Sequence, residues 1–128
     1  MKSEKTLNVI IINENKTIRN ALKLLLMIEY NANILSTFET IDELKPFKES
    51  KKVDIIILGI NLTNIEKYNR LLNQYKDSQI IVVLNQNDKH YYAKIIKSGF
   101  KYCLFVDNIF TELSSILDSF KEENDSRV

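Results

Sequence analysis

The sequence predicts an α/β protein with a five-stranded parallel sheet and helices on both of its faces. The main observation is a set of short, continuous apolar runs rich in Ile and Val, which lie at 7–12, 53–60, 80–84 and 102–106. Continuous runs of this kind are typical of strands that are buried on both faces, and such strands form parallel sheets. A weaker run at 33–38 predicts a further strand near one edge of the sheet.

The first two segments between these runs have helical features. Asn15 is placed to cap a helix in which Ile18, Leu22 and Leu25 recur at helical spacing. The residues 40–43 read Thr-Ile-Asp-Glu, which has the form of a capping box. Pro46 lies too deep for an undisturbed second helix, so this helix is expected to kink or restart there.

The later segments predict three more helices. Ile65, Tyr68, Leu72 and Tyr75 form the third apolar stripe. Asp88 is placed to cap the fourth helix, with Tyr92, Ile95 and Ile96 expected to face inward and Gly99 to end the helix. The last helix has six apolar residues expected on one face: Ile109, Phe110, Leu113, Ile116, Leu117 and Phe120.

The order of elements is therefore strand then helix, repeated five times. Such alternation predicts parallel βαβ units with right-handed crossovers. In about 120 residues it favours a flavodoxin-like sheet with strand order 2-1-3-4-5, whose ligands sit at the carboxyl ends of the strands. We expect one domain over residues 1–122, followed by a hydrophilic and frayed tail over 123–128.

Composition limits the function classes. Lys plus Arg number 18 and Asp plus Glu 17, so no general positive field attracts nucleic acid or an anionic membrane. We therefore expect no direct nucleic-acid binding by this domain and no membrane association. The single cysteine cannot form an internal disulfide, which favours a cytoplasmic setting. Neither a zinc motif nor a phosphate-binding or dinucleotide glycine motif is present, so no cofactor is expected.

Three segments resemble the receiver domain of bacterial two-component response regulators. Residues 10–19 are similar to its first strand, acidic pair and first helix, residues 53–62 to its third strand and phosphoacceptor turn, and residues 98–106 to its fourth-helix end and fifth strand. The resemblance covers nearly the whole chain. It implies an aspartate at the end of the third strand, two acidic residues that help it to hold Mg²⁺, a hydroxyl after the fourth strand and a lysine after the fifth.

This chain departs from that pattern at nearly every position. The acidic pair is Asn13 and Glu14, the acceptor position is Gly59, the hydroxyl position is Asn85 and the lysine position is Val106. Mg²⁺ requires several oxygen ligands and is reluctant to lose water, so one carboxylate is a poor site for it. We therefore interpret the chain as a pseudo-receiver that is not phosphorylated, binds no metal there and is not an enzyme.

Other aspartates and nucleophiles are weaker candidates for the acceptor. Asp88 and Asp107 lie on the correct edge of the sheet, but their expected role is that of helix N-caps. Asp54 begins the third strand, and five residues at about 3.3 Å each place it about 16 Å from Gly59, at the opposite edge of the sheet. Cys103 lies inside an apolar strand, at the position of the aromatic switch residue in receivers, and is expected to be a core residue. His90 is expected to be solvated on the fourth helix.

The favoured function is signalling through a protein partner or a second copy of the chain. The resemblance implies a contact face built from the fourth helix, fifth strand and fifth helix. Its candidate residues are Tyr91, Lys94, Lys97 and Tyr102, with Glu112, Ser115 and Ser119 as the other wall.

Two alternatives remain open. A small uncharged or apolar ligand would bind at the Gly59 edge of the sheet, where a residue without a side chain leaves room. Unusual phosphoryl transfer through Glu14 is the other.

Overall fold

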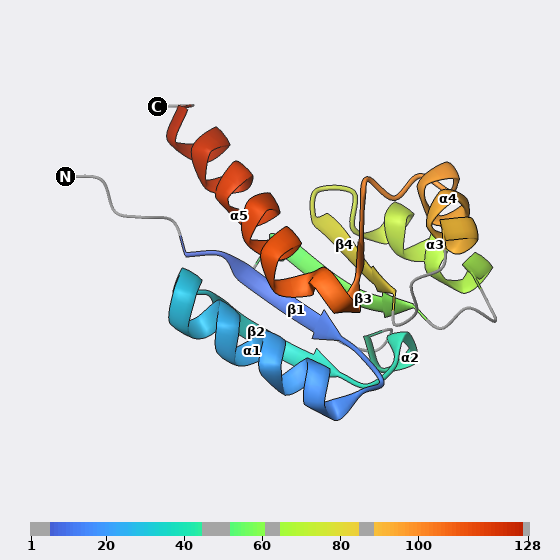
Figure 1. Cartoon of the computed structure of the whole chain (residues 1–128), viewed down its shortest axis with the longest axis horizontal. Coiled ribbons are helices and arrows are strands. Elements are labelled where there is room, and N and C mark those ends of the chain that lie inside the picture. The colour runs from blue at the N-terminus through green and yellow to red at the C-terminus, as the bar shows by residue number, and fades with distance from the viewer. Residues whose placement is uncertain (1–5, 45–51, 61–64, 85–88, 127–128) are drawn as a thin grey trace.

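The computed structural model describes residues 6–44, 52–60, 65–84 and 89–126. Its five strands form one sheet in the order β2-β1-β3-β4-β5, and every neighbouring pair is parallel (Figure 1). The strands are β1 (Asn8–Ile12), β2 (Asn33–Phe38), β3 (Ile55–Ile60), β4 (Gln79–Leu84) and β5 (Tyr102–Phe105). The predicted fold and strand order are confirmed.

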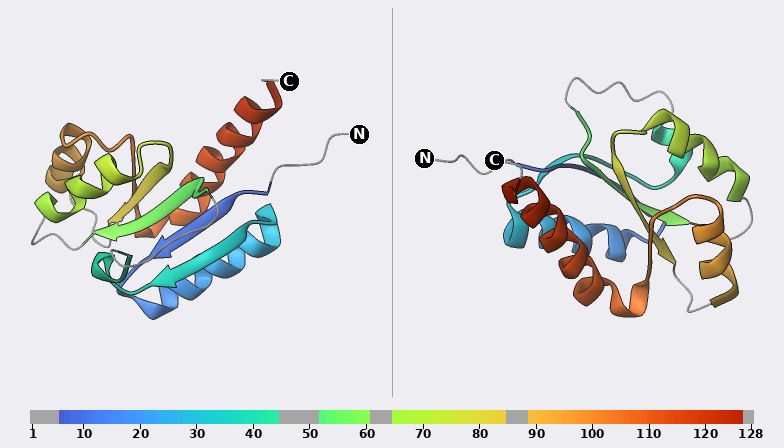
Figure 2. Two further views of the ribbon diagram at one scale, coloured as in Figure 1. Left: turned by 180° about the vertical axis from the view of Figure 1, so that it is seen from behind. Right: turned by 90° about the horizontal axis from the view of Figure 1, so that it is seen from above.

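Helices cover both faces of the sheet (Figure 2). They are α1 (Lys16–Tyr30), α2 (Ile41–Leu44), α3 (Ile65–Gln74), α4 (Lys89–Lys97) and α5 (Ile109–Ser126), and a 3₁₀ turn, η1 (Val106–Asn108), joins β5 to α5. Buried residues of α1 and α5 pack against one face of the sheet, and those of α2, α3 and α4 pack against the other. Pro46 lies outside the described residues, as does Asp88.

Alternation along the strands divides the core into these two layers. Ile10 and Ile12 of β1 pack on the side of α2, α3 and α4, whereas Val9 and Ile11 pack on the side of α1 and α5. All four side chains are at most 1% exposed. The strands are therefore buried on both faces, which explains why their sequences are apolar without a polar alternation.

Local signals fix several helix ends. The side chain of Asn15 accepts a hydrogen bond from the Ile18 amide at 3.1 Å, which confirms it as the N-cap of α1. Asn31 ends α1 in the left-handed region at φ 51°, which asparagine tolerates better than most residues. Gly99 follows α4 with φ 109°, so it is the predicted helix-ending glycine.

Two predicted helix faces are wrong in part. In α4, Ile95 is fully buried, but Tyr92 and Ile96 are 39% and 38% exposed. Tyr91, which we placed on the outer side, packs partly buried against the core. The inward row is thus 91 and 95, and the row 92 and 96, about 100° away, faces outward. A nine-residue helix with two similar apolar rows gives periodicity no means to choose between them.

The last helix differs at one residue. Phe110 is 50% exposed, whereas Ile109, Leu113, Leu117 and Phe120 are buried as predicted. The helix also continues to Ser126. Residues 123–126 are therefore helical, and the division into a domain over 1–122 and a hydrophilic tail stays a prediction.

The two faces of α1 predict different costs for the same substitution. Leu26 is fully buried and Leu24 is 57% exposed. We expect Leu26→Ala to lower the free energy of unfolding by about 2–5 kcal/mol, because it leaves a cavity under the sheet. Leu24→Ala should change it by no more than about 0.5 kcal/mol. Urea unfolding of both variants measures the difference, and equal costs would contradict the assigned face.

Candidate functional site

The carboxyl edge of the sheet brings Asn13 and Gly59 together. Ile11 pairs with Ile57 in the β1–β3 register, and each site residue lies two positions further along its own strand. Residues two apart point to the same face, so both positions are on the α1 and α5 side. Asn13, at the first position of a receiver's acidic pair, and Gly59, at the phosphoacceptor position, are therefore neighbours.

Asn13 is held in place by three hydrogen bonds. Its amide N–H donates to the Phe38 carbonyl at 3.0 Å. Its side-chain Oδ1 accepts from the Asn15 amide at 2.9 Å, which forms an Asx turn into α1. Its carbonyl accepts from the Arg19 guanidinium at 2.6 Å. Asn13 is only 1% exposed, so this network fixes both its backbone and its side chain.

The side chain of Asn13 fills the space above Gly59. A Cβ atom added at Gly59 would lie 2.7 Å from Asn13 Nδ2 and 3.0 Å from its Cγ, both shorter than ordinary packing contacts. Gly59 has no unusual backbone angle, since its φ is not in the left-handed region. The glycine is therefore needed for space, and the room that we expected for a ligand directly above it is taken by the Asn13 amide.

This packing leaves one polar atom without a partner. Within the described part of the chain, Nδ2 of Asn13 is buried and has no hydrogen-bond acceptor. A buried unpaired amide donor is unfavourable by about 1–3 kcal/mol. Any side chain at position 59 would need the space that this amide occupies.

Among the described residues, the remaining positions of the receiver pattern supply one carboxylate and no cation. Glu14 follows Asn13 and is exposed. Val106 begins η1 directly after β5 and packs half-buried against the α1 and α5 core. Asn85 lies outside the described residues. No group of three His, Cys, Asp or Glu side chains suited to a metal occurs among the residues that the structure describes.

Asp54 has a structural role at the opposite edge. Its Oδ2 accepts the Asn8 amide at 2.8 Å, and its own amide donates to the Asn8 carbonyl at 2.9 Å. These bonds join the starts of β1 and β3, so Asp54 is a strand-entry residue, as predicted. No helix in the described segments has the length and apolar character needed to cross a membrane.

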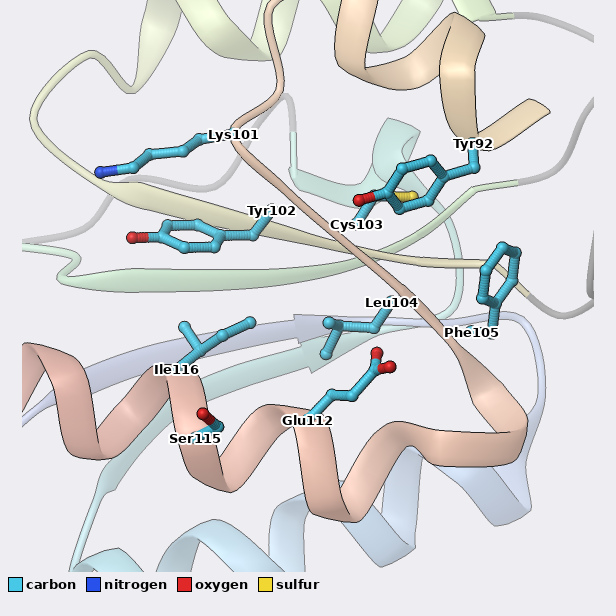
Figure 3. A pocket seen from close by; sticks show the side chains of 9 residues that line it. All are labelled: Tyr92, Lys101, Tyr102, Cys103, Leu104, Phe105, Glu112, Ser115 and Ile116. Carbon is cyan, nitrogen blue, oxygen red and sulfur yellow. The ribbon is translucent and has the colours of Figure 1, made fainter. Parts of the chain in front are cut away.

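A groove lies on the other candidate region, the face made by α4, β5 and α5. Its volume is about 460 Å³. Nine side chains line it, as Figure 3 shows: Tyr92, Lys101, Tyr102, Cys103, Leu104, Phe105, Glu112, Ser115 and Ile116. Of the residues predicted for this face, Tyr102, Glu112 and Ser115 are present. Lys94 and Lys97 are exposed on α4 but do not line the groove, and Tyr91 belongs to the core.

Sequence reasoning missed the aromatic wall of the groove. The rings of Tyr92 and Phe105 lie 5.7 Å apart with a tilt of 31°. The ring of Tyr102 packs edge-on against the ring of Phe120, with 5.5 Å between the ring centres. Lys101 Nζ lies 5.2 Å from the centre of the Tyr102 ring. Alternation on β5 was a usable signal, because it puts Cys103 and Phe105 on one face.

Cys103 lies at the floor of the groove and is 7% exposed. Burial, and secondly the nearby negative charge of Glu112, raise the pKa of its thiol to about 11. Both effects disfavour the thiolate. Cys103 is therefore a poor nucleophile, in agreement with its interpretation as a small core residue.

Solved structures that resemble the chain are response-regulator receivers. The isolated REC domain of RcsB from Salmonella enterica serovar Typhimurium, with the phosphomimetic BeF3⁻, has a TM-score of 0.80 at 14% identity over 92% of this chain and 90% of that chain. A CheY-like receiver domain protein from Methanospirillum hungatei JF-1 has a TM-score of 0.76 at 12% identity, over 97% of this chain and 100% of that chain. The fold is that of a receiver domain.

Another solved structure that resembles the chain is longer. The match with an RcsB chain, solved as two dimers bound to DNA, covers 93% of this chain but only 62% of that chain, at a TM-score of 0.77 and 14% identity. No protein-family model matches the sequence, and no curated protein matches it. The receiver likeness thus establishes the arrangement of strands and helices, while the chemistry must be argued from the side chains.

The contact between Asn13 and Gly59 predicts an energetic coupling. We expect Gly59→Ala to lower the free energy of unfolding by about 1–3 kcal/mol, because its methyl group would overlap the Asn13 amide. In an Asn13→Ala background the same change should cost clearly less, since the amide is gone. A double-mutant cycle by urea unfolding measures the coupling. Simple additivity would show that the two side chains do not compete for space.

The raised pKa of Cys103 predicts slow alkylation. With a pKa of about 11, roughly one thiol in a thousand is ionised at pH 8, so iodoacetamide should react slowly and about tenfold faster for each pH unit. Glu112→Gln should lower the pKa, because it removes a like charge. The same shift lowers folding stability as pH rises from about 9 towards 11, since only the unfolded thiol ionises in that range. If iodoacetamide alkylated Cys103 in the folded protein at pH 8 as fast as in urea, the raised pKa would be contradicted.

Proposed function

We propose that this chain is a pseudo-receiver, which signals by binding a protein partner without being phosphorylated and has no enzymatic activity. The observation that carries the proposal is the Asn13 side chain packed above Gly59. A receiver that accepts a phosphoryl group needs a carboxylate nucleophile at that place, with metal-binding charge beside it. This edge offers an amide, a glycine and one exposed carboxylate instead.

Electrostatics also favours an inert edge. Phosphoryl transfer depends on positioning and on cations that neutralise the developing charge. At the end of β5, where receivers have a lysine, Val106 is packed against the core. Arg19 is the cation that the structure places near Asn13, and its guanidinium already donates to the Asn13 carbonyl. The charges required for the reaction are therefore missing or committed.

The groove on α4, β5 and α5 supports binding through that face. Tyr92 and Ile96 stay 39% and 38% exposed on α4, and aromatic residues are enriched at interface centres because they bury a large area with little entropy loss. A surface of this kind suits a partner protein or a second copy. The DNA-bound RcsB dimers are a structural neighbour in which copies associate, which makes self-association the second form of the proposal.

Intact mass after incubation with acetyl phosphate and Mg²⁺ tests the central point. We expect no mass increase for the wild type, because no carboxylate stands at position 59. Gly59→Asp alone should also remain unmodified, since Asn13 blocks its side chain and Val106 provides no cation. The triple variant with Asn13→Asp, Gly59→Asp and Val106→Lys restores the receiver set and is the positive control to attempt. A phosphorylated wild type would overturn the proposal.

A further inference from the structure

The groove contains a carboxylate, that of Glu112, for which the described residues supply no cation partner. Glu112 is half-buried on the first turns of α5, and its side chain points towards β5 (Figure 3). In the described part of the chain no lysine, arginine or histidine lies within ion-pair distance of it. Lys101 lines the same groove but lies against the Tyr102 ring. A carboxylate partly removed from water favours a partner charge, since burial without one is costly.

The walls of the groove suit a flat cation. The ring of Tyr92 is part of an exposed side chain and packs against Phe105 at 5.7 Å, so one aromatic surface faces the groove. Aromatic faces attract cations within about 6 Å. Lys101 over Tyr102 is an example of such a contact in the same groove, at 5.2 Å. Carboxylate and ring together present the two groups that a guanidinium binds best.

We propose that this groove binds an arginine side chain of a partner protein, beside an apolar residue of the same segment. The inference rests on the proposed function, because it uses the same face, and it names the chemistry of the partner. The guanidinium pairs with Glu112 and stacks on Tyr92, and the apolar neighbour contacts Ile116 and the small floor at Cys103. The volume of about 460 Å³ is that of sites for drug-sized ligands, about 300–1,000 Å³, so it holds two adjacent side chains.

The charges of the groove favour a partner segment with a single arginine over a segment with several basic residues. Lys101 lines the same groove as Glu112, and it repels a second cation. Arginine is preferred to lysine for two reasons. Its guanidinium makes two parallel hydrogen bonds to a carboxylate, and it is less strongly hydrated than an ammonium group, so it enters a half-buried site at lower cost.

NMR titration of the full chain with acetyl-Leu-Arg-Leu-amide tests the inference. Acetyl-Leu-citrulline-Leu-amide is the neutral control of the same shape. We expect amide shifts confined to β5, Tyr92 and the 112–116 segment, and about tenfold tighter binding of the arginine peptide, the usual size of a charge-assisted hydrogen bond. The Glu112→Gln variant should bind the arginine peptide only as weakly as the citrulline peptide. Asp118→Asn, an exposed carboxylate of α5 outside the groove, should leave it unchanged.

Each other outcome overturns the inference in a distinct way. Equal binding of both peptides in the groove would remove the arginine requirement and leave the face as a docking surface. Amide shifts outside the groove, or no shifts at all, would show that the peptide does not bind in the groove. Sedimentation of the chain alone adds a third outcome, because a dimer lost in Glu112→Gln but kept in Asp118→Asn would make a second copy the occupant. None of these results bears on phosphorylation. The acetyl phosphate experiment therefore tests the proposed function separately from this inference.

Discussion

The placement of the Asn13 side chain decides what the carboxyl edge of the sheet can do. One oxygen starts α1 by accepting the Asn15 amide, and the nitrogen of the same side chain lies over Gly59. A larger residue at position 59 would have to displace that nitrogen, and displacement would disturb the entry into α1. Asparagine and glycine therefore depend on each other, and this edge packs with no side chain at position 59.

The sequence was sufficient for the sheet because burial on both faces leaves few alternatives. Strands such as β3 and β4 are continuous runs of Ile, Val and Leu, and the helices between them require parallel crossovers. The residue types at the strand ends, such as Asn13 and Gly59, could also be read from the sequence. What spacing could not give was the Asn13–Gly59 contact, since it depends on register and on a rotamer that only the assembled sheet fixes.

Helix faces were the weaker part of the prediction, and the reason is physical. Both Tyr91–Ile95 and Tyr92–Ile96 are apolar pairs at helical spacing, so α4 has two rows of similar hydrophobicity. The choice between them is made by tertiary contact, where Tyr91 packs against the core and Tyr92 against Phe105. From the row left outside, Tyr92 lines the groove. This outer side of α4 is the one through which we propose that a partner binds.

Strand β5 connects the edge to the groove, and its composition argues for control by a partner. Alternation directs Cys103 and Phe105 to the α4 side, while Val106 packs on the side of α1 and α5. A lysine at the end of β5 would tie the strand to a charge at the edge, but valine can respond only to packing. Phe105 is in turn held by its ring contact with Tyr92. Under the proposed function, a partner that enters the groove would act through its own contacts with these residues, because a ligand shifts a conformation only through differential contacts.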